Sequence, residues 1–305
     1  MEPLPAVVLA YTVSLRRVLR PTRLFFVLAL ASAVTYGAAD FMGGLAARRA
    51  STIAVVVLSQ AAGLVMVAFM LPLLTPAEPS RSDWVWGGIA GLSGGVGVAL
   101  LYRALAVGVM AVVAPTTAVC AVLVPVVVAI ALGERPGARQ TAGIALAIIA
   151  IVLVSQSAPQ SETSVGSAQS TGLGLAFASG VAIGLFFLAL ARTNAAAGLW
   201  PLFAARGVSV TLFGAMALAS RMTLRMRPST LAIALGGGVV DMLANLLYLL
   251  ASRRGPLTLV VTLTSLYPAS TVLLARVVVG ERLAPRQWAG VACALVAIVT
   301  IVGTR

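Results

Sequence analysis

Histidine and lysine are both absent from the 305 residues, and aspartate and glutamate together number only 8. Without histidine the chain lacks a common proton relay, the base of a Ser-His-Asp triad and the commonest metal ligand. The two cysteines, Cys120 and Cys293, each lie inside an apolar run, where a small buried hydrophobe is expected rather than a disulfide or metal ligand. We therefore expect no catalytic residue, no metal site and no cofactor, and predict that the protein is not an enzyme.

Charge is also scarce, since 10% of the residues are charged and 60% are hydrophobic. Soluble domains carry about 25% charged residues, and several apolar runs here exceed the roughly 18 residues that cross a bilayer. All 21 basic residues are arginines, most of them scattered through the loops between predicted helices, with no basic stripe interleaved with aromatic residues. The net charge of +13 therefore predicts no nucleic-acid partner, and composition predicts a protein of the lipid bilayer.

The first 23 residues carry their arginines after an apolar stretch, which is the reverse of the order in a secretory signal. We expect residues 1–23 to form a cytoplasmic arm rather than a cleaved signal. A wrongly chosen start codon would also produce this pattern.

Hydropathy and helix-breaking residues predict an all-α membrane protein with ten transmembrane helices. The predicted spans are 24–46, 52–74, 84–106, 109–132, 137–155, 172–192, 199–220, 229–252, 256–279 and 286–304. A polar stretch rich in Ser, Gln and Gly, residues 156–171, separates the first five helices from the last five. We expect one five-helix repeat at 24–155 and a second at 172–304.

The same sequence block occurs in both halves, in register. Gly133-Glu134-Arg135 returns as Gly280-Glu281-Arg282, and Arg139-Gln140 returns as Arg286-Gln287. Because each copy holds an odd number of helices, the second copy enters the membrane in the opposite orientation, which predicts inverted repeats. Glu134 and Glu281 should then lie on opposite faces, and we interpret the Gly-Glu-Arg turn as a structural glycine cap with interfacial charges.

Three charged residues inside predicted helices stand out, because a charged group at the bilayer centre costs at least about 2.5–3.5 kcal/mol. These residues are Asp40, Arg206 and Asp241. Such groups either bind a substrate or ion, or hold helices together through bonds that average only about 0.6 kcal/mol in membranes. Arg206 lies near the start of its helix, so snorkelling to the interface is a further explanation.

Two of these groups belong to polar stripes. Asn245 and Tyr248 follow Asp241 at i+4 and i+7, and Tyr36 precedes Asp40 by four residues, with Ser32 four residues earlier. Residues at this spacing share one helix face, and a polar face in a membrane contacts protein or water rather than lipid. Prolines at 115, 125 and 268 lie beside hydroxyl residues in the fourth and ninth helices. They indicate either substrate-lining kinks or packing kinks.

Together these motifs resemble the EamA family of the drug/metabolite transporter superfamily. In both repeats the fourth helix ends in Gly-Glu-Arg and Arg-Gln opens the fifth; Tyr36-Gly37, Ala204-Ala205-Arg206 and Tyr267-Pro268 resemble further family patterns. The two copies differ, however, because Gln60 lies near the first-copy place of Arg206, and neither Asp40 nor Asp241 has an acidic counterpart.

The resemblance implies a ten-helix carrier of the bacterial-type inner (plasma) membrane with both termini cytoplasmic, commonly an exporter of metabolites. The distribution of loop arginines favours the same orientation. We therefore expect a secondary-active exporter of a small metabolite or drug-like solute, working by alternating access around a midplane cavity. The alternatives are an uncoupled facilitator or channel, and a lipid-type flippase.

The expected substrate- and ion-binding residues come from the two polar stripes and from Arg206. Asp40 and Asp241 would bind a cation or proton, and Arg206 would recognise an anion or act in gating. Tyr36, Asn245 and Tyr248 would line the site. The expected partners are a small-molecule substrate, the lipid bilayer and a coupling proton or other ion, in a monomer or homodimer.

Overall fold

The structure is a computed structural model that describes residues 21–47, 49–73, 77–107, 110–154, 167–274, 277–278 and 284–302. Residues 1–20 of the predicted arm, residues 155–166 around the predicted linker, and Gly280-Glu281-Arg282 lie outside these ranges. The bounds predicted for the arm, the linker and the two repeats therefore stay predictions.

The described part of the chain is helical and contains no strand. The helices of the first half are α2 (Pro21–Ala47), α3 (Thr52–Met70), α4 (Arg81–Val107), α5 (Met110–Ala131) and α6 (Ala138–Val154). Those of the second half are α7 (Ser167–Ala191), α8 (Trp200–Ala219), α9 (Pro228–Ser252), α10 (Leu257–Thr264), α11 (Tyr267–Leu274) and α12 (Pro285–Val302). Short 3-10 turns, Leu71–Leu73 and Ala195–Ala197, follow α3 and α7.

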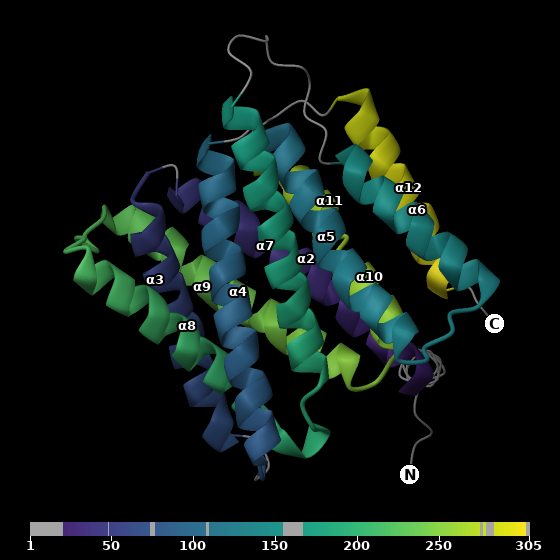
Figure 1. The fold of residues 1–305 in the computed structure, drawn as a ribbon, viewed down its shortest axis with the longest axis horizontal. Helices are drawn as coiled ribbons and strands as arrows, with labels where there is room; N and C mark the ends of the chain where they lie inside the picture. Colours follow the sequence, from purple (N-terminus) through teal and green to yellow (C-terminus); the bar gives the residue numbers. More distant parts are fainter. Residues whose placement is uncertain are drawn as a thin grey trace, which may run out of the picture.

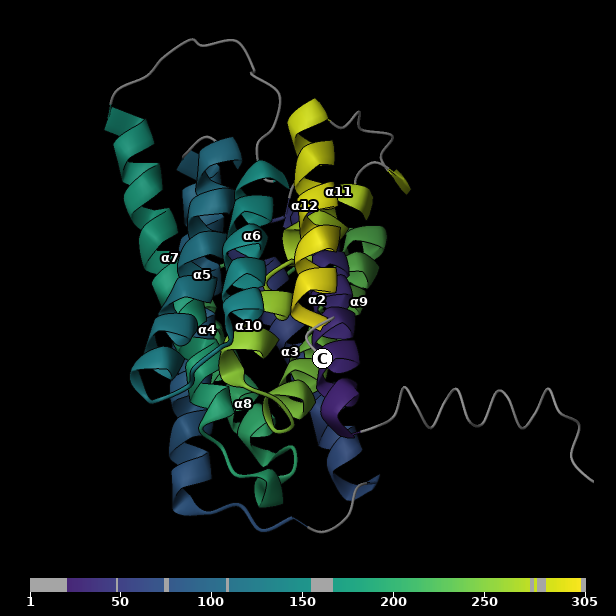
Figure 2. The same ribbon diagram turned by 90° about the vertical axis from the view of Figure 1, so that its right-hand side faces the viewer.

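Seven of the described helices are long and apolar enough to cross a membrane, and three shorter apolar helical segments lie among them. The shorter segments are Thr117–Ala131, Ala138–Leu153 and Leu257–Ser270. The last of these joins α10 to α11, so that the pair counts as one crossing. In Figure 2, α5, α6, α7 and α12 run lengthwise side by side, whereas Figure 1 shows the α6–α12 pair and α8 inclined to α4. This arrangement confirms the predicted all-α architecture of five plus five transmembrane helices.

The ninth crossing was predicted as one helix over 256–279, but it is broken at Ser265 and Leu266. Pro268 has no N–H to donate to the Thr264 carbonyl, which weakens the helix at this point. The Leu266 N–H bonds the Leu263 carbonyl at 3.2 Å in a tighter turn, and α11 then begins. The same residue type does not break α5, which continues through both of its prolines.

The main helix contacts are matched when the two halves are exchanged. α2 packs on α9 as α7 packs on α4, and α3 packs on α9 as α8 packs on α4. Three further contacts, α3 with α8, α5 with α10, and α6 with α12, join helices that occupy equivalent positions in the two repeats. A twofold relation between the halves follows, and the odd helix number per half makes the repeats inverted.

Hydrogen bonds between the halves obey the same relation. The Ser32 hydroxyl donates to the Ala244 carbonyl at 2.8 Å, and the Ser179 hydroxyl donates to the Gly97 carbonyl at 2.8 Å. Ser179 follows Ser32 by 147 residues, and Ala244 follows Gly97 by the same 147 residues. A second matched pair comprises Thr117 to the Ala176 carbonyl (3.1 Å) and Thr264 to the Ala29 carbonyl (3.5 Å).

Close helix contacts through glycine are matched as well. A Cβ on Gly91 would lie 2.3 Å from the carbonyl oxygen of Ala205, and a Cβ on Gly238 would lie 2.1 Å from that of Ser59. Gly91 and Gly238 are again 147 residues apart. Small residues at such positions let membrane helices approach closely.

The contacts divide the molecule into two groups of helices. The first group comprises α4, α5, α7 and α8, and the second comprises α2, α3, α9, α10 and α11. The α6–α12 pair lies to one side, at the right of Figure 1. We call the face where α2 begins the proximal face, at the bottom of Figure 2, and the opposite one the distal face. The α3–α4, α5–α6, α7–α8 and α9–α10 connections lie at the proximal face.

Candidate functional site

A cavity lies between the two helix groups. Its lining comes from α2, α3 and α9 of the second group, together with Tyr267 of α11, and from α4, α7 and α8 of the first. Asp40, Arg206 and Asp241 all line this one cavity. The three charged residues selected from the sequence are therefore brought together rather than held in separate helix contacts.

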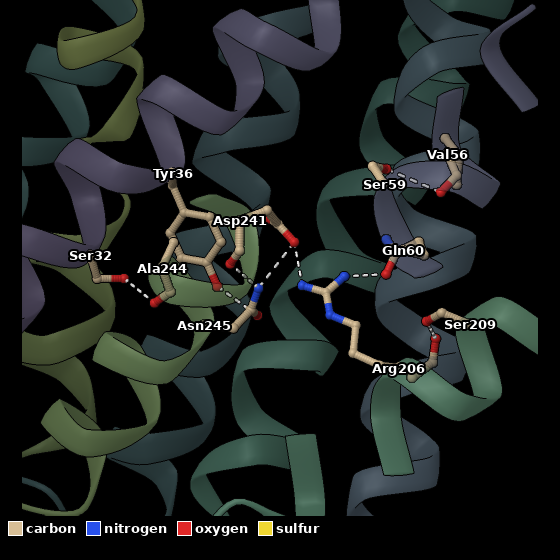
Figure 3. Close-up of polar contacts among 11 residues, drawn as sticks. Ser32, Tyr36, Val56, Ser59, Gln60, Arg206, Ser209, Asp241, Ala244 and Asn245 are labelled. Atoms are coloured by element: carbon tan, nitrogen blue, oxygen red, sulfur yellow. Dashed lines mark hydrogen bonds and ion pairs between the residues drawn. The ribbon is translucent and has the colours of Figure 1, made fainter. Parts of the chain in front are cut away.

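Arg206 is at the centre of the polar network (Figure 3). Its Nη2 forms an ion pair with the Asp241 carboxylate on α9, and its Nη1 donates to the amide oxygen of Gln60 on α3. The residue is only 7% exposed, so its guanidinium is paired inside the protein and does not extend to the membrane surface. Gly63 provides room for it, since a Cβ there would lie 3.3 Å from the Arg206 Nε.

The polar stripe of α9 continues the network toward α2. The Asn245 side-chain amide donates to the backbone carbonyl of Asp241 at 2.7 Å and to its carboxylate at 3.2 Å. The Tyr36 hydroxyl donates to the Asn245 Oδ1 at 2.9 Å, as Figure 3 shows. Polar contacts thus run without interruption from Tyr36 through Asn245, Asp241 and Arg206 to Gln60, and connect four helices.

Asp40 differs from the other charged groups because it is exposed. In the described part of the chain, no hydrogen bond or ion pair is seen on its carboxylate. It lies about two turns before the distal end of α2, whereas Asn245 and Arg206 are buried deeper. Among the three charged residues of the cavity, Asp40 is therefore the most accessible and lies nearest the distal face.

Tyr248 is placed differently from the other predicted site residues. It is fully buried and is not among the residues that line the cavity. Its hydroxyl donates to the Phe187 carbonyl at 2.7 Å, and the two rings lie 4.7 Å apart. It therefore holds α9 against α7 behind the cavity wall.

Aromatic rings form much of the remaining wall. The Tyr36 ring lies 6.0 Å from the Phe187 ring in an edge-on arrangement and 6.3 Å from the Tyr267 ring, and Phe186 lies beside Phe187. Sequence reasoning selected neither Gln60 nor these aromatic partners of Tyr36 as site residues. Gln60 could have been selected from the sequence, because an amide in the middle of an apolar membrane helix also needs a polar partner.

Ten transmembrane helices in two inverted repeats, with a polar cavity between the helix groups, define a membrane transporter of the inverted-repeat class. The model of the EamA-like transporter family matches residues 23–156 and 170–303, once in each repeat, and the chain belongs to this family. The resemblance found in the sequence motifs is thereby confirmed. The protein is a multi-pass membrane transporter of the drug/metabolite type, and its partners are a small-molecule substrate and the membrane.

Among solved structures, one titled "Crystal structure of protein" is similar over 92% of this chain and 95% of its own, with a TM-score of 0.70. Its sequence identity is 17%, so the likeness concerns the fold alone. No curated protein matches the chain by sequence.

Proposed function

We propose that the protein is a secondary-active exporter in which the two helix groups rock about the cavity and expose it to each face in turn. The sequence contains no nucleotide-binding glycine loop, so the energy would come from an ion gradient. The observation that carries the proposal is the position of Asp40, Arg206 and Asp241 around one cavity between the two groups.

The charges of this cavity favour a positively charged occupant. Two carboxylates, Asp40 and Asp241, face a single guanidinium, and Arg206 is already paired with Asp241. The exposed carboxylate of Asp40 is therefore the group we assign to a proton or to the cationic group of a solute. The rings of Tyr36 and Tyr267 line the same cavity, and aromatic faces also attract organic cations.

The Arg206–Asp241 ion pair provides a route from ion binding to movement. Arg206 belongs to α8 in the first helix group, whereas Asp241 and Gln60 belong to the second. A proton or cation taken up by Asp241 would weaken its attraction for Arg206 and remove a bond between the groups. Competition between protons and a cationic solute for the two carboxylates would then couple proton entry to solute exit.

Uptake into proteoliposomes tests this assignment, with tetraethylammonium as the cationic probe and an uncharged sugar as the neutral one. We expect Asp40→Asn and Asp241→Asn each to lower pH-gradient-driven uptake of the cation at least about tenfold, the change that corresponds to losing one charge-assisted contact. Glu78→Gln, which removes an exposed carboxylate at the proximal face, should leave uptake unchanged.

The assignment fails if both aspartate variants transport the cation like the wild type under a pH gradient. Flux that is the same with and without the gradient would instead support the uncoupled facilitator.

A further inference from the structure

Two polar contacts join the helix groups at the proximal face, away from the cavity. The first involves Glu134, which follows α5 of the first group. Its Oε1 accepts the N–H of Leu257 at 2.8 Å, and its Oε2 accepts the N–H of Thr258 at 3.0 Å. These residues open α10 of the second group, where the first N–H groups have no partner within the helix. A carboxylate is also favoured there by the positive end of the helix dipole.

The turn that presents Glu134 is the repeated Gly-Glu-Arg segment. Gly133 adopts a φ of +102°, which a glycine tolerates best, and its N–H bonds the Ile130 carbonyl at 3.0 Å. The N–H of Glu134 then bonds the Ala129 carbonyl at 3.0 Å. This glycine cap fixes the backbone so that the carboxylate of Glu134 points across to the other helix group.

The second contact involves Arg253, between α9 and α10 of the second group. Its Nη2 donates to the carbonyl of Asn194 at 2.9 Å, in the α7–α8 connection of the first group. Asp83 on α4 holds that connection in place, since its carboxylate accepts the Asn194 N–H at 2.7 Å and also attracts Arg253 electrostatically. Arg253 therefore meets a carbonyl and a negative charge from the first group.

In the repeat relation, the two residues of the second contact correspond to alanines near the distal face. The 147-residue offset maps Arg253 onto Ala106 and Asn194 onto Ala47. Ala106 has no guanidinium that could donate to the backbone carbonyl of Ala47, so the donor of this contact is missing there. The counterpart of Glu134 is Glu281, which lies outside the described residues.

We propose that Glu134 and Arg253 are gating residues that keep the proximal face closed and must release before the cavity opens there. Because alanines replace Arg253 and Asn194 at the corresponding positions near the distal face, the substrate-free protein rests mainly in the state that is open toward the distal face. The greater exposure of Asp40, toward that face, agrees with this bias. The proposal goes beyond the proposed function because it concerns an equilibrium that exists whatever solute is carried.

Distances between spin labels test the gate without any substrate. Cys120 and Cys293 are replaced by alanine, and pairs of cysteines are introduced for nitroxide labels. Pro72→Cys with Arg192→Cys reports on the proximal face, and Arg49→Cys with Arg221→Cys reports on the distal face; all four positions are exposed. Each pair joins the second helix group to the first.

In the wild type, we expect the two labels at the proximal face to show mainly one short distance from each other. Arg253→Ala, which installs the residue of the distal counterpart, should raise the population with a longer proximal distance about threefold, the effect of losing one exposed charged contact. Glu134→Gln should shift the distances in the same direction. The distal distance should shorten in both variants, which a merely local loosening of the proximal loops would not produce.

Arg254→Ala is the matched control, because Arg254 is the next residue and its Nη1 donates to the Leu250 carbonyl of α9, within the same helix group. It removes the same charge and should leave both distances unchanged. The gate is disproved if folded Arg253→Ala keeps the wild-type distances at both faces, or if Arg254→Ala shifts them equally. Arg253 lies in a connecting turn, so this variant decides the question even if Glu134→Gln fails to fold.

Discussion

Ser32 of the first repeat and Ser179 of the second make the same hydrogen bond to the opposite repeat, at the same 2.8 Å. The charged residues that line the cavity have no such match in the other repeat. By the same offset, Arg206 corresponds to Ser59 and Asp241 corresponds to Gly94. The two repeats therefore agree where helices pack and differ where the charges lie.

This difference has a physical reason. In a transporter of inverted repeats, each helix interface occurs twice, once in each of two equivalent places. Both interfaces must pack equally well, so the residues that form them stay similar in the two repeats. The cavity lies between the halves and binds one solute at a time, so a single set of charges serves both states. A second arginine and aspartate in the matching places would add buried charge without a second ligand to bind.

Removing one member of the ion pair should have the largest effect on stability. Arg206→Gln leaves the Asp241 carboxylate, with 31% of its side chain exposed, without its cation. We expect a loss of about 3 kcal/mol in the free energy of unfolding, the lower end for a broken buried pair because Asp241 is partly exposed. Denaturant unfolding in detergent, followed by circular dichroism, would measure it.

The double variant Arg206→Gln with Asp241→Asn sharpens this prediction. Because no charge is left unpaired, it should recover part of the loss, so that its destabilisation is smaller than the sum of the two single changes. Additive losses would contradict a direct coupling between Arg206 and Asp241.

The packing side of the comparison is tested by alanine at matched glycines. Gly91→Ala and Gly238→Ala would each place a Cβ within 2.3 Å of a backbone carbonyl oxygen, which cannot move without separating two helices. We expect each to lower the unfolding free energy by about 2 kcal/mol.

Gly88→Ala is the control on α4, since no atom lies within 4 Å of its added Cβ. It should be neutral or slightly stabilising, because alanine favours a helix over glycine. Equal losses at all three positions would contradict the packing role.

Much of this architecture could be predicted from the sequence, because periodic apolar runs and the offset between repeated motifs depend only on residue order. The four-residue spacing in α2 and α9 also placed Tyr36, Asp40, Asp241 and Asn245 on polar faces. Spacing within one helix does not show which helix lies opposite. The partner of Arg206 on α3, the position of Tyr248 behind the wall and the contact of Glu134 with α10 all depend on packing between helices.

Tyr36→Phe tests the asymmetric network at one of its ends. It removes the donor to the Asn245 Oδ1, while the matching residue Ile183 has no hydroxyl at all. We expect a loss of about 1 kcal/mol in unfolding free energy, the usual net value of one hydrogen bond. Thermal unfolding in detergent would measure the loss. Ile183→Val is the control at the matching place, and a larger effect there than at Tyr36 would argue against the network.

Ser32→Ala and Ser179→Ala should have the smallest effects, and their equality matters more than their size. Each removes one hydroxyl that donates to a carbonyl of the other repeat, and such bonds in membranes average about 0.6 kcal/mol. The two bonds are equally long and both serines are fully buried, so the two losses of unfolding free energy should agree within error. If one serine contributed clearly more than the other, the asymmetry of the cavity would extend into the helix packing, and the repeats would be alike in geometry but not in energy.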